Sequence, residues 1–154
     1  MIDGPNIKAN PLRIAVGLLV ISYIVGEFVL PKYNLLYFFN IIGILGIIFS
    51  ISIFFSAFNI FKSYEENPVP SSHTNRLIKT GIFAYTRNPI YLSFVVFNLS
   101  MFLTFENVMY FLSSLGLAFW IHNYIILEEE KYLLDKFPEE FSRYMNSVKR
   151  WIFF

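Results

Sequence analysis

Four long apolar stretches, each close to the length of a membrane-spanning helix, limit the possible folds of this chain more than any other feature. A helix needs about 20 predominantly apolar residues to cross a bilayer core of roughly 30 Å. Of the 154 residues, 56% are hydrophobic and 19 are Phe, more large apolar side chains than a soluble core of this size can bury. The sequence therefore predicts an all-α integral membrane protein, a single membrane domain over residues 1–154 with about four transmembrane helices and an amphipathic, cytoplasmic C-terminal helical tail. The expected spans are 12–30, 35–61, 89–105 and 108–127.

The positions of Lys and Arg predict the orientation, because cytoplasmic loops of membrane proteins carry an excess of both. Of the 12 Lys and Arg, only Lys32 lies in the connections that follow the first and third spans. We therefore expect a multi-pass protein with both termini, the loop 62–88 and the tail 128–154 in the cytoplasm. The opposite connections are too short to build a site, so any chemistry is expected at the cytoplasmic face. The other basic residues are Lys8, Arg13, Lys62, Arg76, Lys79, Arg87, Lys131, Lys136, Arg143, Lys149 and Arg150.

Several classes of site are excluded by composition. The chain has no Cys, which rules out disulfides, thiol nucleophiles and thiolate metal sites. Its two His, His73 and His122, lie far apart without ligand spacing, so we expect no metal, and we expect His73 to be a surface residue. A net charge of +1 with no basic patch gives no indication of nucleic-acid binding.

The triplet Arg87-Asn88-Pro89 stands where the third span begins and admits two interpretations. Asn is a favoured N-cap and Pro a favoured first residue, so the triplet is a good structural start for a helix. The same geometry leaves unpaired N–H groups and a positive dipole end beside a guanidinium, an arrangement that favours an anionic ligand. Three nearby aromatic residues offer surface for a ring or a cation: Phe83, Tyr85 and Tyr91.

The run Glu128-Glu129-Glu130 directly follows the fourth span. Such residues are ordinary at the headgroup level, yet anions at a helix C-terminus are disfavoured unless the helix continues or a cation binds. Span three begins and span four ends on the same side, so the Glu run and the Arg-Asn-Pro corner are expected to lie close together. A zwitterionic ligand would use both, with its carboxylate at Arg87 and its cationic groups near Glu129 and Glu130.

Other patterns predict packing rather than chemistry. The spacing of Gly43, Gly46 and Ser50 favours close helix packing. Polar residues within the spans are candidates for acceptor contacts, although we favour interhelical hydrogen bonds for them; they are Asn98, His122 and Asn123. In the tail, apolar residues recur every three or four positions and predict an amphipathic helix broken at Pro138: Leu133, Phe137, Phe141, Tyr144 and Val148.

Two segments resemble the signatures of the isoprenylcysteine carboxyl methyltransferase and phospholipid methyltransferase superfamily. The run "LIKTGIFAYTRNPIYLS" carries a Gly followed by an aromatic residue, then Arg-Asn-Pro and a Tyr two residues later. The run "EEKYLLDKFPEEFSRYMNSVKRW" is similar to the second signature, and the resemblance covers roughly the C-terminal half of the chain, from about Val69. It departs from the family pattern at four positions, where Asn88 replaces a His, Pro138 a Gly, Phe141 a Tyr and Lys149 a Pro.

This resemblance implies a membrane methyltransferase that uses S-adenosylmethionine, bound at the cytoplasmic side without a Rossmann domain or a metal. Its acceptor would be a lipophilic small molecule or a lipid. Asn88 removes an imidazole that could act as a base, so proton removal at that position is in doubt. Carried over by position, the cofactor-binding residues would be Gly81, Tyr85, Arg87, Asn88, Pro89, Tyr91, Glu129, Glu130 and Tyr144, and the catalytic residues Arg87, Glu129 and Arg150.

Two alternatives stay open. A sterol-reductase-like membrane oxidoreductase would bind a nicotinamide cofactor on the same face, and it predicts a site for an extra phosphate for which the tail has no obvious Arg cluster. A non-catalytic membrane protein would keep these residues for packing or partner binding. The methylated atom of the acceptor, the use of a general base and the oligomeric state are not determined by the sequence.

Overall fold

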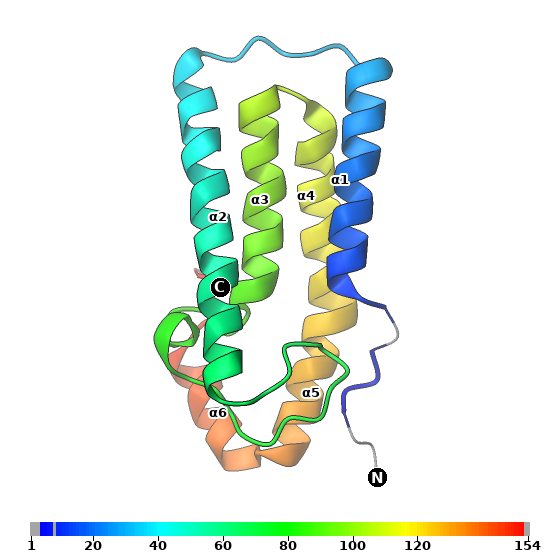
Figure 1. The fold of residues 1–154 in the computed structure, drawn as a ribbon. Helices are drawn as coiled ribbons and strands as arrows, with labels where there is room; N and C mark the ends of the chain where they lie inside the picture. Colours follow the sequence, from blue (N-terminus) through cyan, green and yellow to red (C-terminus); the bar gives the residue numbers. More distant parts are fainter. Residues whose placement is uncertain (1–3, 8, 153–154) are drawn as a thin grey trace.

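Helices make up the framework of the protein, with no strand among the residues described, 4–7 and 9–152 of a computed structural model (Figure 1). Lys8, one of the residues used to predict orientation, lies outside the described residues. Four long helices run side by side in the order α2, α3, α4, α1, and shorter elements gather at one end (Figure 1). The long helices are α1 (Pro11–Phe28), α2 (Tyr37–Ser63), α3 (Pro89–Phe105) and α4 (Val108–Ile121).

The shorter elements follow from α4 and from the loop that precedes α3. They are a 3₁₀ turn η1 (Gly81–Ala84), a π-helical segment η2 (His122–Ile126), α5 (Leu127–Lys136) and α6 (Pro138–Ser147). Because α4, η2 and α5 form one continuous helix, the Glu run lies within a helix and escapes the unfavourable C-terminal end of the dipole. The break predicted at Pro138 is confirmed, since α5 ends at Lys136 and α6 begins at Pro138.

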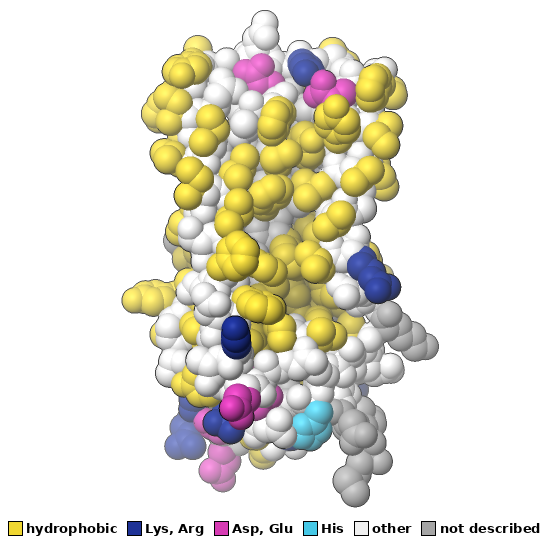
Figure 2. Space-filling view, viewed as in Figure 1, with side chains coloured by type: hydrophobic (Ala, Val, Ile, Leu, Met, Phe, Trp, Pro, Cys, Tyr) yellow, Lys and Arg dark blue, Asp and Glu magenta, His cyan; other side chains and the backbone are white. Residues whose placement is uncertain are grey.

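The lengths and surfaces of the helices confirm the predicted all-α integral membrane fold. Among the described residues, three helices are long and apolar enough to cross a membrane: α1, α2 and the continuous helix Val108–Lys136. The apolar helix α3, with 17 residues, is shorter. On the face shown in Figure 2, apolar side chains cover the upper part of the molecule, and charged side chains gather at its two ends.

The two ends of the bundle differ in what they contain. We call the end with connections 29–36 and 106–107 the hairpin end. We call the opposite end, with loop 64–88, α5, α6 and the chain after α6, the tail end. Helix α2, at 27 residues, extends past its neighbour α3 at the tail end and supports the loop there (Figure 1).

The small residues of α2 bring it into close contact with α3, as predicted. A Cβ atom added at Gly43 would lie 2.7 Å from the backbone N of Thr104 and 2.9 Å from the backbone O of Ser100. A Cβ atom at Gly46 would lie 2.3 Å from Ser100 Oγ. Small residues therefore let these backbones approach each other, which is how membrane helices gain van der Waals contact.

The interhelical hydrogen bonds predicted for Asn98 and Asn123 are wrong. Each side chain donates to a carbonyl one turn earlier in its own helix, Phe94 O at 3.0 Å and Phe119 O at 2.7 Å. This local bond is available to a short side chain with an N–H or O–H donor and needs no partner helix. Other side chains make interhelical bonds: Ser22 Oγ with Ser113 Oγ at 2.6 Å, Ser114 Oγ to Val95 O at 2.9 Å, and Asn40 Nδ2 to Leu103 O at 3.1 Å.

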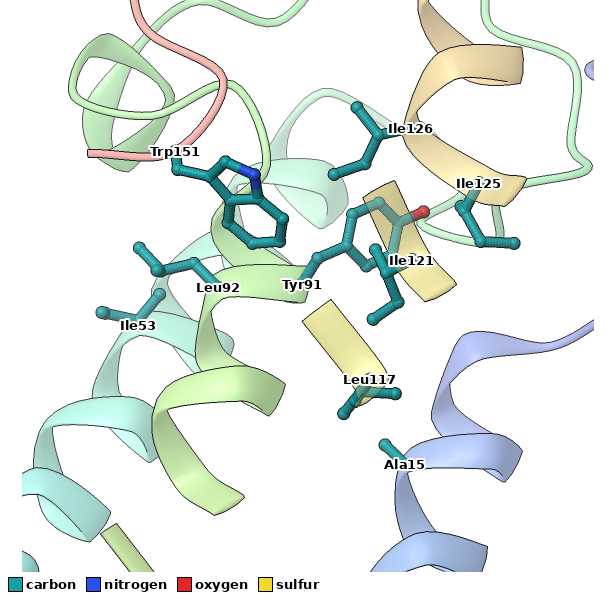
Figure 3. Close-up of a cluster of buried hydrophobic side chains, with 9 residues drawn as sticks. All are labelled: Ala15, Ile53, Tyr91, Leu92, Leu117, Ile121, Ile125, Ile126 and Trp151. Carbon is teal, nitrogen blue, oxygen red and sulfur yellow. The ribbon is translucent and has the colours of Figure 1, made fainter. Parts of the chain in front are cut away.

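A buried apolar cluster joins the four helices just above the tail end (Figure 3). Tyr91 and Leu92 come from the first turn of α3, and Trp151 comes from the chain after α6. Through this cluster, the start of α3, the π-helical segment and the end of the tail pack against one another. The remaining members are Ala15, Ile53, Leu117, Ile121, Ile125 and Ile126.

Candidate functional site

A cavity of about 790 Å³, including its open mouth, lies at the tail end. Loop 66–78 forms one side, and α5, α6 and the segment before α3 form the others. Its walls combine apolar and aromatic side chains with a few polar groups, as is typical of small-molecule sites. The aromatic side chains are Phe61, Phe83, Tyr132, Phe141 and Tyr144, and the charged or amide side chains are Glu66, Asn67, Arg76, Arg87, Asn88, Glu129 and Glu130.

Glu130 sits between two guanidinium groups. Arg87 Nη2 donates to Glu130 Oε1 at 2.7 Å, while Arg150 donates through Nε to Oε1 at 2.9 Å and through Nη2 to Oε2. Burial alone would raise the pKa of Glu130, but the hydrogen bonds from Arg150 and Arg87 outweigh it and lower the pKa. The predicted proximity of the Arg-Asn-Pro corner and the Glu run is therefore confirmed, and Glu130 stays ionised.

Arg87 also donates hydrogen bonds to backbone carbonyls of the tail. Its Nη1 donates to Val148 O at 2.6 Å and to Met145 O at 3.1 Å, and its backbone N–H donates to Lys149 O at 3.0 Å. Both terminal nitrogens are thus bound within the protein, and the buried Nε has no hydrogen-bond partner among the residues described. The Arg87 side chain is 9% exposed, so the clamp is largely shielded from solvent.

The N-cap predicted for Asn88 is wrong in its contacts, although α3 begins at Pro89 as expected. The Asn88 side chain accepts no capping hydrogen bond, and its Nδ2 donates to Arg150 O at 3.0 Å. Thr86 Oγ1 donates to the same carbonyl at 3.1 Å. The side-chain amide of Asn88 therefore binds the backbone of the tail at Arg150 and does not cap α3, the role that the sequence predicts for it.

Glu129, next to Glu130 in sequence, has a different environment. Tyr91 OH donates to its Oε1 at 2.7 Å, and Oε2 has no hydrogen bond within the described part of the chain. The side chain lines the cavity. Burial raises the pKa of Glu129 to about 8 and the charge of Glu130 adds to this, while the bond from Tyr91 opposes it. One oxygen of this carboxyl is thus available to a cation that enters the cavity.

His122, a candidate for acceptor contact, lies against the tail and is not part of the cavity wall. Arg150 Nη1 is 3.4 Å from His122 Nε2, and Trp151 Nε1 is 3.5 Å from Nδ1. The π-helical segment begins at this residue, and such segments commonly occur at functional sites. His122 thus contributes to holding Arg150 beside Glu130.

The site residues predicted from the sequence line the cavity, contact the Glu pair or lie outside the cavity wall. Tyr144 lines the cavity and donates through its OH to Phe83 O at 2.6 Å; burial raises its pKa, so the hydroxyl remains protonated. Arg87, Asn88, Glu129 and Glu130 also line the cavity, and Tyr91 and Arg150 contact the Glu pair. Outside the cavity wall lie Gly81 with its positive φ of 58°, the buried Pro89, and Tyr85, which is 74% exposed.

Sequence reasoning missed the loop side of the cavity. Glu66 has a buried carboxylate that accepts the N–H of Asn75 at 3.1 and 3.2 Å. The hydroxyl of Tyr132 in α5 accepts the N–H of Thr74 at 3.3 Å. In the sequence this loop is rich in Pro, Ser and Asn, and no motif singles out Glu66 or Tyr132.

His73, expected at the surface, is exposed, and its Nε2 accepts a hydrogen bond from Lys136 Nζ at 2.7 Å. Lys136 also donates to the hydroxyl of Tyr132 at 3.1 Å. These contacts fasten the loop to α5 beside the cavity. Another contact, between Lys79 and Glu140, joins the loop to α6.

A family model described as phospholipid methyltransferase matches residues 36–140, more than half of the chain. The chain therefore belongs to the phospholipid methyltransferase family. The matched region contains Arg87 and the Glu pair and ends before Tyr144 and Arg150. None of the curated proteins compared with the chain matches it. Membership of the phospholipid methyltransferase family indicates a membrane methyltransferase, in agreement with the resemblance found in the two signature segments.

Proposed function

We propose that this protein transfers a methyl group from S-adenosylmethionine to a lipophilic or lipid-linked acceptor at the cytoplasmic face of a membrane. The observation that carries the proposal is the cavity at the tail end, where Glu129 lines the wall with one carboxylate oxygen unbonded. The family match supports the reaction class and a lipid acceptor. Most Lys and Arg residues belong to the segments expected at this end, and this excess supports a cytoplasmic location.

The residues of the cavity fit this cofactor. A sulfonium and an ammonium group require negative charge nearby, and Glu129 supplies it once its proton is lost. Aromatic side chains in the wall, among them Phe83 and Tyr132, offer flat surfaces for an adenine ring.

When bound, S-adenosylmethionine supplies a methyl group on a sulfonium, which is activated for in-line displacement. The protein needs to position the reactants and exclude water, and it needs no covalent step of its own. The ion pairs of Arg87 and Arg150 with Glu130 hold the tail against the start of α3, which closes that side of the cavity. In this proposal Arg87 and Arg150 are positioning residues, and Glu129 is the group that contacts the ligand.

An amine acceptor would also release a proton. Glu129 is suited to take up this proton because burial raises its pKa to about 8, and a general base works best when its pKa lies near the pH of the reaction. Glu130 is not suited, because its two guanidinium partners keep its pKa low. Asn88, which stands in the place of an imidazole, has a neutral amide bonded to Arg150 O.

No specific observation favours the alternatives. A reductase with a phosphorylated nicotinamide cofactor would need a group of uncommitted cations, whereas in the described cavity wall Arg87 is bonded to Glu130 and only Arg76 remains. A non-catalytic role predicts that replacing Glu129 changes no ligand affinity.

The proposal is tested by methyl transfer in membranes that contain the protein, with methyl-labelled S-adenosylmethionine and a total lipid extract. Labelled lipid product is expected with the unaltered protein, and at least about tenfold less with Glu129→Gln, because the lost charge weakens a charge-assisted contact. Glu128→Gln is the matched control, since this neighbour does not line the cavity. No transfer above that of membranes lacking the protein would contradict the proposal.

A further inference from the structure

Two cationic side chains line the described part of the cavity, Arg76 and Arg87. Arg87 has both terminal nitrogens bound, to Glu130 and to carbonyls of the tail. Three of the four terminal N–H groups of Arg87 are therefore bound within the protein, and its charge is paired with that of Glu130. Arg76 comes from loop 66–78 and directly precedes the first signature run, which begins at Leu77.

The backbone around Arg76 is held in place from both sides. The N–H of Asn75 donates to both carboxylate oxygens of Glu66, whose side chain is 3% exposed. Two residues further on, Ile78 is buried and packs with Ala57 and Phe83. The position of Arg76 at the cavity is therefore set by the fold of the loop rather than by the arginine itself.

The guanidinium of Arg76 keeps its hydrogen-bonding capacity. Its Nε forms an ion pair with Glu66 Oε1 at 3.8 Å, which is beyond hydrogen-bond distance, and the side chain is 61% exposed. No other hydrogen bond or ion pair of this side chain occurs among the described residues. A planar guanidinium with two unbound terminal nitrogens is the side chain best suited to grip a carboxylate or a phosphate.

We propose that Arg76 is a binding residue of this site and recognises an anionic oxygen group of the ligand, opposite the carboxyl of Glu129. The cavity then offers a cation on the loop and a carboxylate on α5, and these match the two charges of a zwitterion. This inference rests on the proposed function, because it concerns the same cavity. The anionic group comes either from the carboxylate of S-adenosylmethionine or from the phosphate of a lipid acceptor.

The test compares Arg76→Gln with the unaltered protein in two measurements. The first is calorimetric titration with S-adenosylmethionine and with its decarboxylated analogue. The second is the KM for phosphatidylethanolamine vesicles in the methyl-transfer assay. Arg143→Gln is the matched control, since Arg143 is an exposed arginine of α6 outside the cavity wall. Thermal unfolding verifies that each variant is folded.

If Arg76 binds the cofactor carboxylate, Arg76→Gln weakens S-adenosylmethionine about tenfold or more and changes the affinity of the decarboxylated analogue by less than about twofold. If it binds the acceptor phosphate, both affinities stay unchanged and the KM for vesicles rises about tenfold. In either case Arg76→Lys restores part of the loss, because it returns the charge without the planar fork.

Unchanged affinities and an unchanged KM in Arg76→Gln, with normal binding by the unaltered protein, would overturn the inference and leave the proposed function standing. An equal loss in Arg143→Gln would overturn it as well, since it would indicate a general effect of positive charge. If the unaltered, folded protein binds neither form of the cofactor, the proposed function fails, and the inference fails with it.

Discussion

The two ends of the helix bundle use polar residues in different ways. At the hairpin end, Glu106 accepts the N–H of Leu35 at 3.0 Å, and Asn107 caps α4 through Met109 N at 2.9 Å. Each of these side chains closes a connection between helices. At the tail end, Glu129 and Arg76 line a cavity and keep unbound oxygen or nitrogen atoms. Unused bonding capacity at a cavity, rather than charge alone, separates the candidate site from the structural polar groups.

The same contrast separates the two neighbours Glu130 and Glu129. Both carboxylate oxygens of Glu130 accept hydrogen bonds from Arg87 or Arg150, and these ion pairs hold the tail in place. Glu129 has one hydrogen bond and contacts the cavity. Changes at the first should lower stability, and changes at the second should lower ligand affinity.

The largest expected effect on stability is that of Glu130→Ala. Removing this carboxylate leaves the buried Arg87 without its ionic partner, a change that typically lowers the free energy of unfolding by about 3–5 kcal/mol. Denaturant unfolding in detergent measures it, with Glu128→Ala as the control. A loss below about 1 kcal/mol would contradict the role of Glu130 as the clamp of the tail, since exposed ion pairs contribute that little.

A smaller loss is expected where α2 and α3 approach each other. Gly43→Ala places a Cβ atom 2.7 Å from the backbone N of Thr104, and overpacking of this kind typically costs about 1–3 kcal/mol. Gly116→Ala is the control, because an added Cβ atom there meets nothing within 4 Å. Equal unfolding free energies for Gly43→Ala and the control would show that the close approach is not needed for stability.

The raised pKa of Glu129 predicts how stability depends on pH. Between its ordinary value of 4.5 and about 8, the folded state binds the Glu129 proton more tightly than the unfolded state does. Its contribution to stability is therefore fully present below pH 4.5, declines as the pH rises through about 8, and changes no further above that. Unfolding measured across this range should show the decline in the unaltered protein relative to Glu129→Gln. Parallel curves for the two proteins would refute the buried, proton-holding state of Glu129.

The smallest expected effect is at the surface of the tail end. Lys79 and Glu140 are each 43% exposed, so their ion pair is weakened by solvent and salt. Lys79→Gln should lower the free energy of unfolding by about 0.2–1 kcal/mol, and less at high salt. A loss as large as that of Glu130→Ala would mean that the exposed contact, rather than the buried clamp, holds α6.

Much of the fold could be predicted because it depends on local chemistry. The length of the apolar runs identifies the long helices, and proline marks the start of α3 and the break before α6. The contact between the Arg-Asn-Pro corner and the Glu run followed from the short connection between α3 and α4. These features depend on residues close together in the sequence or on simple topology.

The detail of the site could not be predicted because its partners are distant in sequence. Asn88 bonds to the carbonyl of Arg150 rather than capping α3, and Thr74 bonds to Tyr132 in α5. Neighbouring residues of a helix point about 100° apart, so the sequence does not tell which of Glu129 and Glu130 meets the guanidinium groups. Only the packed arrangement of the tail and the loop separates the two roles.

The most direct test of the account is calorimetric titration of S-adenosylmethionine into detergent-purified protein, comparing the unaltered chain with Glu129→Gln and Glu106→Gln. Glu129→Gln removes a tail-end carboxyl group that is negatively charged once its proton is lost, and Glu106→Gln removes a carboxylate at the hairpin end. Glu129→Gln is expected to weaken binding at least about tenfold, and Glu106→Gln is expected to change it less than about twofold. Equal affinity of Glu129→Gln and the unaltered protein, or an equal loss in both variants, would contradict the assignment of ligand binding to the tail end.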